Sequence, residues 1–121
     1  MKPVLMKPLD AVWLLMETAD TPMHMGVLAI FKQPPSGGKH YLAQLAAEMR
    51  AVPAVAPWNR RVSRRIAYRL VEEKDFDIDY HFRRSALPQP GGERELGQMV
   101  SRLHSNPLDL ARPLWELHLI E

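Results

Sequence analysis

Three residues of metal-binding type alternate along one stretch of the chain: Asp77, Asp79 and His81. In a β-strand, residues two apart lie on the same face, so this spacing would place two carboxylates and an imidazole side by side. With one coordination position left open, such a set resembles a catalytic metal site. Parallel side chains on a strand do not converge on one ion, however, and Arg83 and Arg84 follow to pair with the carboxylates. We therefore expect a solvated sheet face and assign no metal ligand, with metal-dependent hydrolysis as the alternative.

A run of arginines is the second group of residues that could bind a ligand. Its members are Arg60, Arg61, Arg64 and Arg65, and Arg69 follows. Guanidinium groups bind phosphate oxygens through paired hydrogen bonds, so this run could hold the phosphates of coenzyme A or the headgroup of an anionic lipid. A solvated basic face is the alternative interpretation. Arg60, Arg61, Arg64 and Arg65 are the candidate binding residues.

The histidines form a third group, because imidazole exchanges protons near neutral pH and can act as a general base. His24, His40, His104 and His118 lie in different predicted parts of the chain, and we expect each to be structural. The sequence has no Gly-x-Ser-x-Gly motif, no glycine-rich loop after a predicted strand and no cysteine. Thiol nucleophiles, disulfides and thiolate zinc sites are therefore excluded within these residues.

The elements that position these residues follow from the apolar pattern. Helices are predicted where apolar residues recur every three or four positions, and strands where they alternate or form short runs. The predicted order is a helix with Asp10 as N-cap, a strand over 23–31 buried on both faces, a helix over 39–50, a strand over 75–84, a helix over 93–105 and a strand over 113–121. Residues 66–71 fit either a strand or a helix end. A mixed α/β fold with a small sheet follows.

The composition is that of one globular domain. The chain has 121 residues, of which 46% are hydrophobic and 25% charged, enough to bury a core. The net charge of +2 is too small to indicate a nucleic-acid partner. No apolar run approaches the roughly 20 residues that span a bilayer. The first residues lack the apolar segment and cleavage site of a signal peptide, so we expect a cytoplasmic protein.

Three groups of residues carry a resemblance to a known family. They comprise, in chain order, Pro8–Asp10, Met16–Glu17 and Thr21–Gly26; then Phe76–Pro88; then Arg94–Leu96, Ser101–Ser105, Pro107–Asp109 and Arg112–Glu116. These collinear blocks resemble the bacterial wax ester synthase/diacylglycerol acyltransferase family. The resemblance extends almost from end to end, and it is weakest over residues 33–70.

The resemblance implies the α/β fold of CoA-dependent acyltransferases, similar to chloramphenicol acetyltransferase, in which two similar halves enclose a channel. It implies acyl transfer from acyl-CoA to a long-chain alcohol or a diacylglycerol, giving wax esters or triacylglycerol. Acyl-CoA is then a substrate, and no cofactor is expected. In the family, the second histidine of a His-His-x-x-x-Asp-Gly motif is the base that deprotonates the alcohol.

The sequence departs from the family at this motif, because it contains neither an adjacent histidine pair nor an Asp-Gly dipeptide. In the family, the motif follows shortly after the block that Pro113–Glu116 matches. We therefore expect residues 1–121 to be the N-terminal portion of a longer acyltransferase domain, forming scaffold and channel wall and inactive alone. No catalytic residue is assigned here.

The implied partners are acyl-CoA, the alcohol or diacylglycerol, and the remainder of the same polypeptide, without nucleic acid. Lipid substrates also imply peripheral contact with the inner membrane or with lipid inclusions. The alternative is a non-catalytic module, derived from the same fold, that binds an acyl chain or a partner protein.

Overall fold

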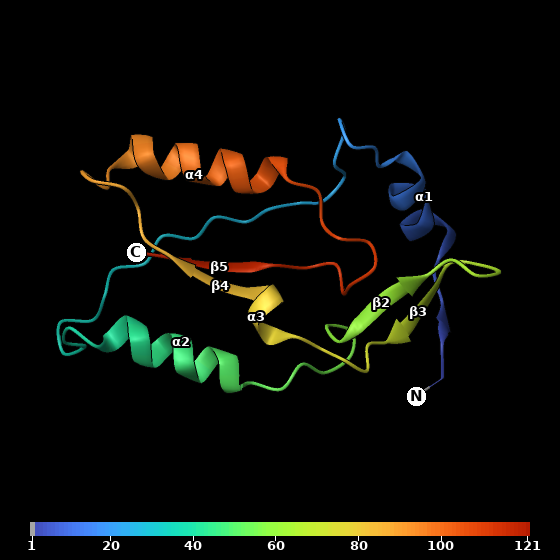
Figure 1. Ribbon diagram of the computed structural model, residues 1–121, viewed down its shortest axis with the longest axis horizontal. Helices are drawn as coiled ribbons and strands as arrows, with labels where there is room; N and C mark the ends of the chain where they lie inside the picture. Colours follow the sequence, from blue (N-terminus) through green and yellow to red (C-terminus); the bar gives the residue numbers. More distant parts are fainter. Residues whose placement is uncertain (1) are drawn as a thin grey trace.

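The computed structural model describes residues 2–121, which form nine short elements. In chain order they are β1 (Val4–Leu5), α1 (Pro8–Met16), α2 (Tyr41–Ala51), β2 (Arg60–Ser63), β3 (Arg69–Glu72), α3 (Ile78–His81), β4 (Phe82–Ser85), α4 (Glu93–Ser105) and β5 (Leu117–Ile120). The parallel pair β4–β5 lies between α4 and α2 in Figure 1, and the antiparallel sheet β1–β3–β2 lies at the other end beside α1. The mixed α/β class is as predicted.

The helices follow the predicted amphipathic pattern. α2 and α4 occupy the predicted ranges to within two residues. α1 is also a helix, but it begins at Pro8, and Asp10 lies in its first turn rather than at its N-cap. Proline suits the start of a helix because it has no N–H to leave unpaired. Asp10 still favours the helix, since a carboxylate there stabilises the positive end of the helix dipole.

Residues 23–31 do not form the predicted strand. The chain crosses between α4 and β5 without regular structure (Figure 1), and Met25, Val27 and Phe31 are 92%, 96% and 89% exposed. A strand needs a neighbour to pair its backbone N–H and C=O groups. Within residues 2–121, no strand pairs with this segment. The apolar run predicts burial, but the described chain supplies nothing to cover it.

The strand predicted over 75–84 is half wrong. α3 replaces its middle part, and only β4 is a strand. The Asp77 carboxylate accepts a hydrogen bond from the backbone N–H of Asp79 at 3.0 Å, which starts a helical turn. The helical turn breaks the alternation of faces, so His81 becomes buried instead of lying on a polar strand face.

β2 and β3 form a hairpin that the apolar pattern did not single out. The pairs run from Arg60↔Glu72 to Ser63↔Arg69, so residues 66–71, which fitted two structures, contribute to a strand. One face of this hairpin carries Val62, which is 5% exposed. β1 joins the outer edge of β3.

The parallel pair β4–β5 brings together residues about 35 positions apart, in register from Phe82↔Leu117 to Ser85↔Ile120. The strand predicted over 113–121 is confirmed only in its second half. Pro113 has no N–H for a ladder, and the N–H of Trp115 turns back to the Pro113 carbonyl at 2.9 Å. Residues 113–116 therefore lead into the strand as a turn.

Both long helices contact this strand pair. The Arg50 guanidinium of α2 lies 5.3 Å from the centre of the Phe82 ring, and the Ser85 hydroxyl of β4 lies 3.7 Å from the sulfur of Met99 in α4. The buried hydrophobic side chains of the described residues are Ala46, Val62, Phe82 and Met99, and Pro113 is buried as well. Among residues 2–121, no helix is long and apolar enough to cross a membrane.

Candidate functional site

The residues that precede β5 and those in and before the short helix α3 contribute aromatic rings to one stack. The His81 ring contacts both Phe76 and Trp115, with ring centres 4.8 Å and 4.6 Å away and planes within 25° of parallel, and the Phe76 and Trp115 rings lie 6.1 Å from each other. His81 Nδ1 is 2.8 Å from the Trp115 carbonyl oxygen. Because a carbonyl only accepts, His81 donates from Nδ1, and the neutral ring then carries its lone pair on Nε2. The histidine is thereby held in one tautomer and one orientation.

Trp115 also ties this stack to the chain before β2. Its Nε1–H donates to the Trp58 carbonyl oxygen at 2.7 Å, and the two indole rings meet edge to face at 6.3 Å. Residues before β2, in α3 and before β5 therefore converge on one indole.

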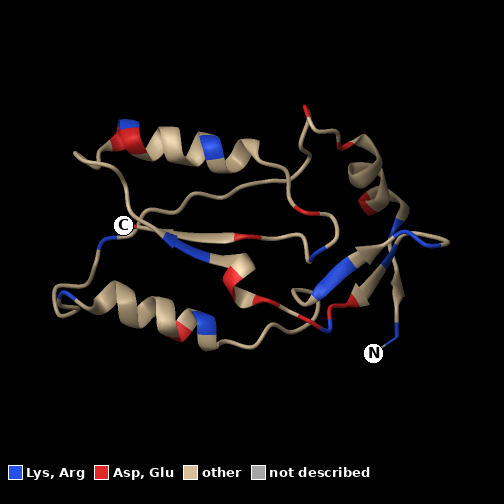
Figure 2. Cartoon of the chain, viewed as in Figure 1, with Lys and Arg blue, Asp and Glu red and all other residues tan. Residues whose placement is uncertain are grey.

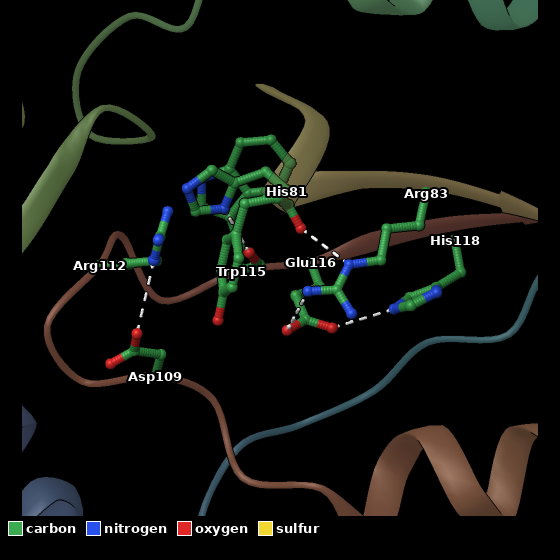
Figure 3. Close-up of polar contacts among 8 residues, drawn as sticks. His81, Arg83, Asp109, Arg112, Trp115, Glu116 and His118 are labelled. Carbon is green, nitrogen blue, oxygen red and sulfur yellow. Dashed lines mark hydrogen bonds and ion pairs between the residues drawn. The ribbon is translucent and has the colours of Figure 1, made fainter. Parts of the chain in front are cut away.

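A charged network crosses the parallel strands next to this stack (Figure 3). Glu116 accepts from His118 Nε2 at 3.0 Å through one oxygen and pairs with the Arg83 guanidinium at 3.6 Å through the other. Arg83 and His118 are direct neighbours in the strand register. Arg83 Nε also donates to the Tyr80 carbonyl at 2.9 Å. Glu116 thus holds a histidine and an arginine from two strands in fixed positions.

Tyr80 lies between two guanidinium groups. Arg112 lies 4.2 Å and Arg83 5.0 Å from its ring centre, and Arg112 also pairs with Asp109 at 3.5 Å. Burial, followed by the negative charges of Glu116 and Asp109, raises the pKa of Tyr80 above its ordinary value of 10.0. The phenol therefore stays protonated and neutral near pH 7.

A hollow of about 350 Å³ opens beside the stack. Its wall consists of Glu73, Asp75, Asp77, His81, Asp109, Ala111, Arg112 and Pro113. Four of these eight residues are carboxylates, so the wall disfavours an anionic group such as a phosphate.

Asp77, Asp79 and His81 are not brought together as one ligand set. Asp77 caps α3, the Asp79 carboxylate pairs with Arg50 of α2 at 3.0 Å, and His81 sits in the aromatic stack. No group of three metal-ligating side chains is found among residues 2–121. The predicted solvated strand face is also wrong for His81, because the turn at α3 directs its ring inward, where it is 1% exposed.

The arginine candidates divide between a strand and a turn. Arg60 and Arg61 lie in β2, and Arg64 and Arg65 lie in the turn that leads to β3. Arg61 pairs with Glu73 at 3.1 Å, and the Arg64 guanidinium lies 5.7 Å from the Tyr68 ring centre. Arg61 and Arg65 line the same hollow of about 540 Å³. The four side chains share a hairpin but do not converge on one point.

The histidines outside the stack take separate positions. His24 meets His104 of α4 edge to face at 4.8 Å, which holds the start of the irregular segment 23–31 against this helix. Gly26 suits this contact, since a Cβ there would lie 3.1 Å from His104 Nδ1 and the imidazole would have to shift slightly. His40 precedes the first residue of α2. His118 alone among these four has a charged partner in the described chain.

The sequence did not assign Glu116 and Arg83 to a site, although a signal existed. Glu116 and His118 are two residues apart in a predicted strand, which places them on one face. The pairing of β5 with β4 brings Arg83 to the same face, and no sequence pattern specifies that pairing.

Comparison with known proteins decides the family. The family described as "Wax ester synthase/diacylglycerol acyltransferase catalytic domain" matches residues 6–121. The chain belongs to this family. The solved wax ester synthase/diacylglycerol acyltransferase from Marinobacter aquaeolei VT8 is 42% identical and superimposes with a TM-score of 0.90 over 100% of this chain and 29% of its own.

Relatives from Mycobacterium tuberculosis (strain H37Rv) are equally similar. "Putative diacyglycerol O-acyltransferase Rv3480c" is 47% identical over 119 residues, covering 94% of this chain and 24% of its own length. "Probable diacyglycerol O-acyltransferase tgs2" is 39% identical over 122 residues, covering 97% and 27% respectively. The chain therefore spans about a quarter of the length of these relatives. The expected fold, that of the N-terminal part of a CoA-dependent acyltransferase, is confirmed by the structural match.

Proposed function

We propose that this chain is the N-terminal portion of an acyl-CoA-dependent O-acyltransferase that esterifies a long-chain alcohol or a diacylglycerol. The observation that carries the proposal is the family match over residues 6–121, together with the TM-score of 0.90 to a wax ester synthase/diacylglycerol acyltransferase. Acyl-CoA is a substrate in this proposal, and no cofactor is invoked.

In the proposed reaction, the acceptor hydroxyl loses its proton to a general base as its oxygen attacks the thioester carbonyl. The tetrahedral intermediate then expels the coenzyme A thiolate, leaving the ester, and the thiolate takes up a proton. No residue of this chain is assigned as the base. His81 and His118 are oriented by a carbonyl and a carboxylate respectively, and we assign both to the support of the strand pair.

The role proposed for this chain is scaffold and channel wall. The stack around His81 and the Glu116 network fix β4 against β5, so they give a rigid base to whatever packs on those strands. The exposed apolar segment 23–31 supports a further layer of polypeptide over it, because exposed apolar runs of this size are typical of interfaces. Arg60, Arg61, Arg64 and Arg65 remain the candidates for contacting the phosphates of coenzyme A or a lipid headgroup.

The test compares two proteins. One is the 121-residue chain, and the other continues to the length of the family relatives. Each receives palmitoyl-CoA with hexadecanol or with a diacylglycerol, and released thiol is measured with a chromogenic disulfide. We expect acceptor-dependent release by the longer protein and none by the 121 residues.

Acceptor-dependent release of coenzyme A by the 121-residue chain would overturn its role as a scaffold. The non-catalytic alternative predicts a different result, namely no release by the longer protein together with saturable binding of an acyl chain.

A further inference from the structure

The turn between β2 and β3 presents an isoleucine to solvent among arginines. Ile66 is 95% exposed, and Arg64 and Arg65 precede it. Arg69, also exposed, begins β3 directly after the turn. Figure 2 shows that this turn projects from one end of the chain and that positive charge gathers on it and on the neighbouring strands. At this exposure, the Ile66 side chain makes no contribution to the hydrophobic core of the described residues.

The positive charge of the turn is not neutralised by neighbouring carboxylates. Within residues 2–121, ion pairs join Arg61 to Glu73 but join none of Arg64, Arg65 and Arg69 to an acidic residue. Three guanidinium groups around Ile66 are therefore available to an external anion.

The hollow of about 540 Å³ lies directly behind this turn. Its wall near the turn includes Arg65, Ile66 and Arg69, whereas Glu72, Glu73 and Asp75 line it further along the hairpin, with Arg61 and Lys74 among them. The carboxylates of the wall lie away from the turn, so an anion is favoured beside the turn. Leu5, which is 63% exposed, is paired with Arg69 in the sheet and extends the apolar surface beside the arginines.

We propose that the β2–β3 turn docks on the surface of an anionic lipid bilayer, with Ile66 entering the headgroup layer and Arg64, Arg65 and Arg69 contacting lipid phosphates. Apolar side chains bordered by cations are the combination that binds such interfaces. Arginine suits this place because its guanidinium binds phosphate bidentately while its methylene stem lies along apolar groups. A nucleic acid would use the arginines but not the exposed Ile66 and Leu5. The inference deepens the proposed function and rests on it for a lipid substrate.

The experiment measures co-sedimentation of the full-length protein with vesicles. One set of vesicles is pure phosphatidylcholine, and the other contains phosphatidylglycerol in addition. We expect binding to the anionic vesicles that falls as salt is raised, and weak binding to the neutral ones. Arg64→Gln/Arg65→Gln should lower the partition coefficient about 20-fold, since each arginine near an anionic surface contributes about fivefold. Ile66→Ser should lower it also.

The matched control is Arg94→Gln/Arg102→Gln, which removes the same charge from exposed positions of α4 at the other end of the fold. This variant should bind as wild type does. The inference is overturned if wild type binds both vesicle types equally, or if the two double variants lose binding equally. It is also overturned if Arg64→Gln/Arg65→Gln raises the KM for acyl-CoA and leaves vesicle binding unchanged. The last result would assign the arginines to coenzyme A.

Assays on the same full-length protein distinguish a failure of this inference from a failure of the proposed function. Acyl transfer by wild type is measured in detergent, without vesicles. Transfer in detergent without vesicle binding refutes the docking surface alone. Vesicle binding without transfer supports the docking surface and refutes the enzymatic proposal alone.

Discussion

Trp115 makes three different contacts that hold the centre of this fold. Its ring stacks on His81, its carbonyl accepts from the same histidine, and its Nε1–H donates to the carbonyl of Trp58. The stacking and the bond to Trp58 belong to the indole, and the His81 ring on which it stacks is 1% exposed, so removing the indole would open a buried part of the fold. The strand pair therefore depends on this indole more than on the exposed ion pair between Arg84 and Glu121.

Two substitutions of Trp115 distinguish the contribution of its ring to stability from that of its side-chain hydrogen bond. Trp115→Phe keeps the stacking and loses the bond to Trp58, so it should lower the free energy of unfolding by about 1 kcal/mol. Trp115→Ala removes the ring as well and should cost about 3 kcal/mol. Urea denaturation of the full-length protein measures both. Glu121→Gln is the control, because it removes one partner of the exposed ion pair with Arg84 and should change stability much less. Equal losses for Glu121→Gln and Trp115→Ala would contradict the role given to Trp115.

Tyr80 should ionise above the ordinary pKa of a tyrosine. Its pKa is raised from 10.0 by burial and by the negative charges of Glu116 and Asp109, so its phenolate should appear late in an alkaline titration. The folded state holds this proton more tightly than the unfolded chain does. The resulting stability is complete below the ordinary pKa of 10.0 and is lost as pH rises through the folded-state pKa.

Ultraviolet titration of tyrosinate measures this ionisation, and Tyr80→Phe identifies it as a late step, above pH 10.0. Glu116→Gln should lower the pKa of Tyr80, because it removes a negative charge that disfavours the phenolate. Glu121→Gln is the matched control, since Glu121 pairs with Arg84 and does not act on Tyr80. An unchanged late step in Glu116→Gln would show that Glu116 does not act on this phenol.

Secondary elements were predictable where local pattern alone determines them. α4 forms over the predicted range because its apolar residues recur at helical spacing and Glu95 accepts from the Gly92 N–H at 2.9 Å. The strand over 75–84 failed because one carboxylate, that of Asp77, starts a turn that the alternation does not reveal. Residues 23–31 failed for another reason, since no strand among residues 2–121 pairs with that segment.

The candidate site was less predictable than the elements. The same-face spacing of Glu116 and His118 is visible in the sequence, but their meeting with Arg83 depends on the β4–β5 register. The burial of His81 likewise depends on the turn at α3. The arginines over residues 60–69 are visible as a run in the sequence, and only the hairpin shows how they divide between β2, the turn and β3.

The turn at α3 supplies a prediction about Asp77. Asp77→Ala removes the side-chain oxygen that accepts from Asp79 N–H, which should cost about 1 kcal/mol in the free energy of unfolding. Asp75→Ala removes an exposed carboxylate two residues away that caps no helix, so it should change stability by less than about 0.5 kcal/mol. Urea denaturation compares the two. Similar losses at both positions would mean that the turn does not depend on this cap.

The described residues expose more large apolar side chains than they bury. Side chains of α1 and of residues 23–31 are open to solvent, whereas the buried apolar residues are Ala46, Val62, Phe82, Met99 and Pro113. Together with the length of the family relatives, this imbalance supports the proposal that the chain is one layer of a larger fold.

The 121 residues expressed alone should therefore self-associate. Light scattering after size-exclusion chromatography should show a mass above that of a monomer, because contiguous exposed apolar surface associates in water. Val27→Lys/Phe31→Lys should reduce the association, whereas Lys2→Gln/Lys7→Gln, which alters charge but not apolar area, should not. A monodisperse wild-type monomer with a cooperative thermal transition would contradict this prediction.

The central claim is that this chain belongs to a working acyltransferase. The most direct measurement quantifies ester and coenzyme A together when a protein that continues to the length of the family relatives receives palmitoyl-CoA and hexadecanol or a diacylglycerol. The account predicts one ester formed for each coenzyme A released, with at least one of the two acceptors. Release of coenzyme A without ester, or no release with either acceptor, would contradict it.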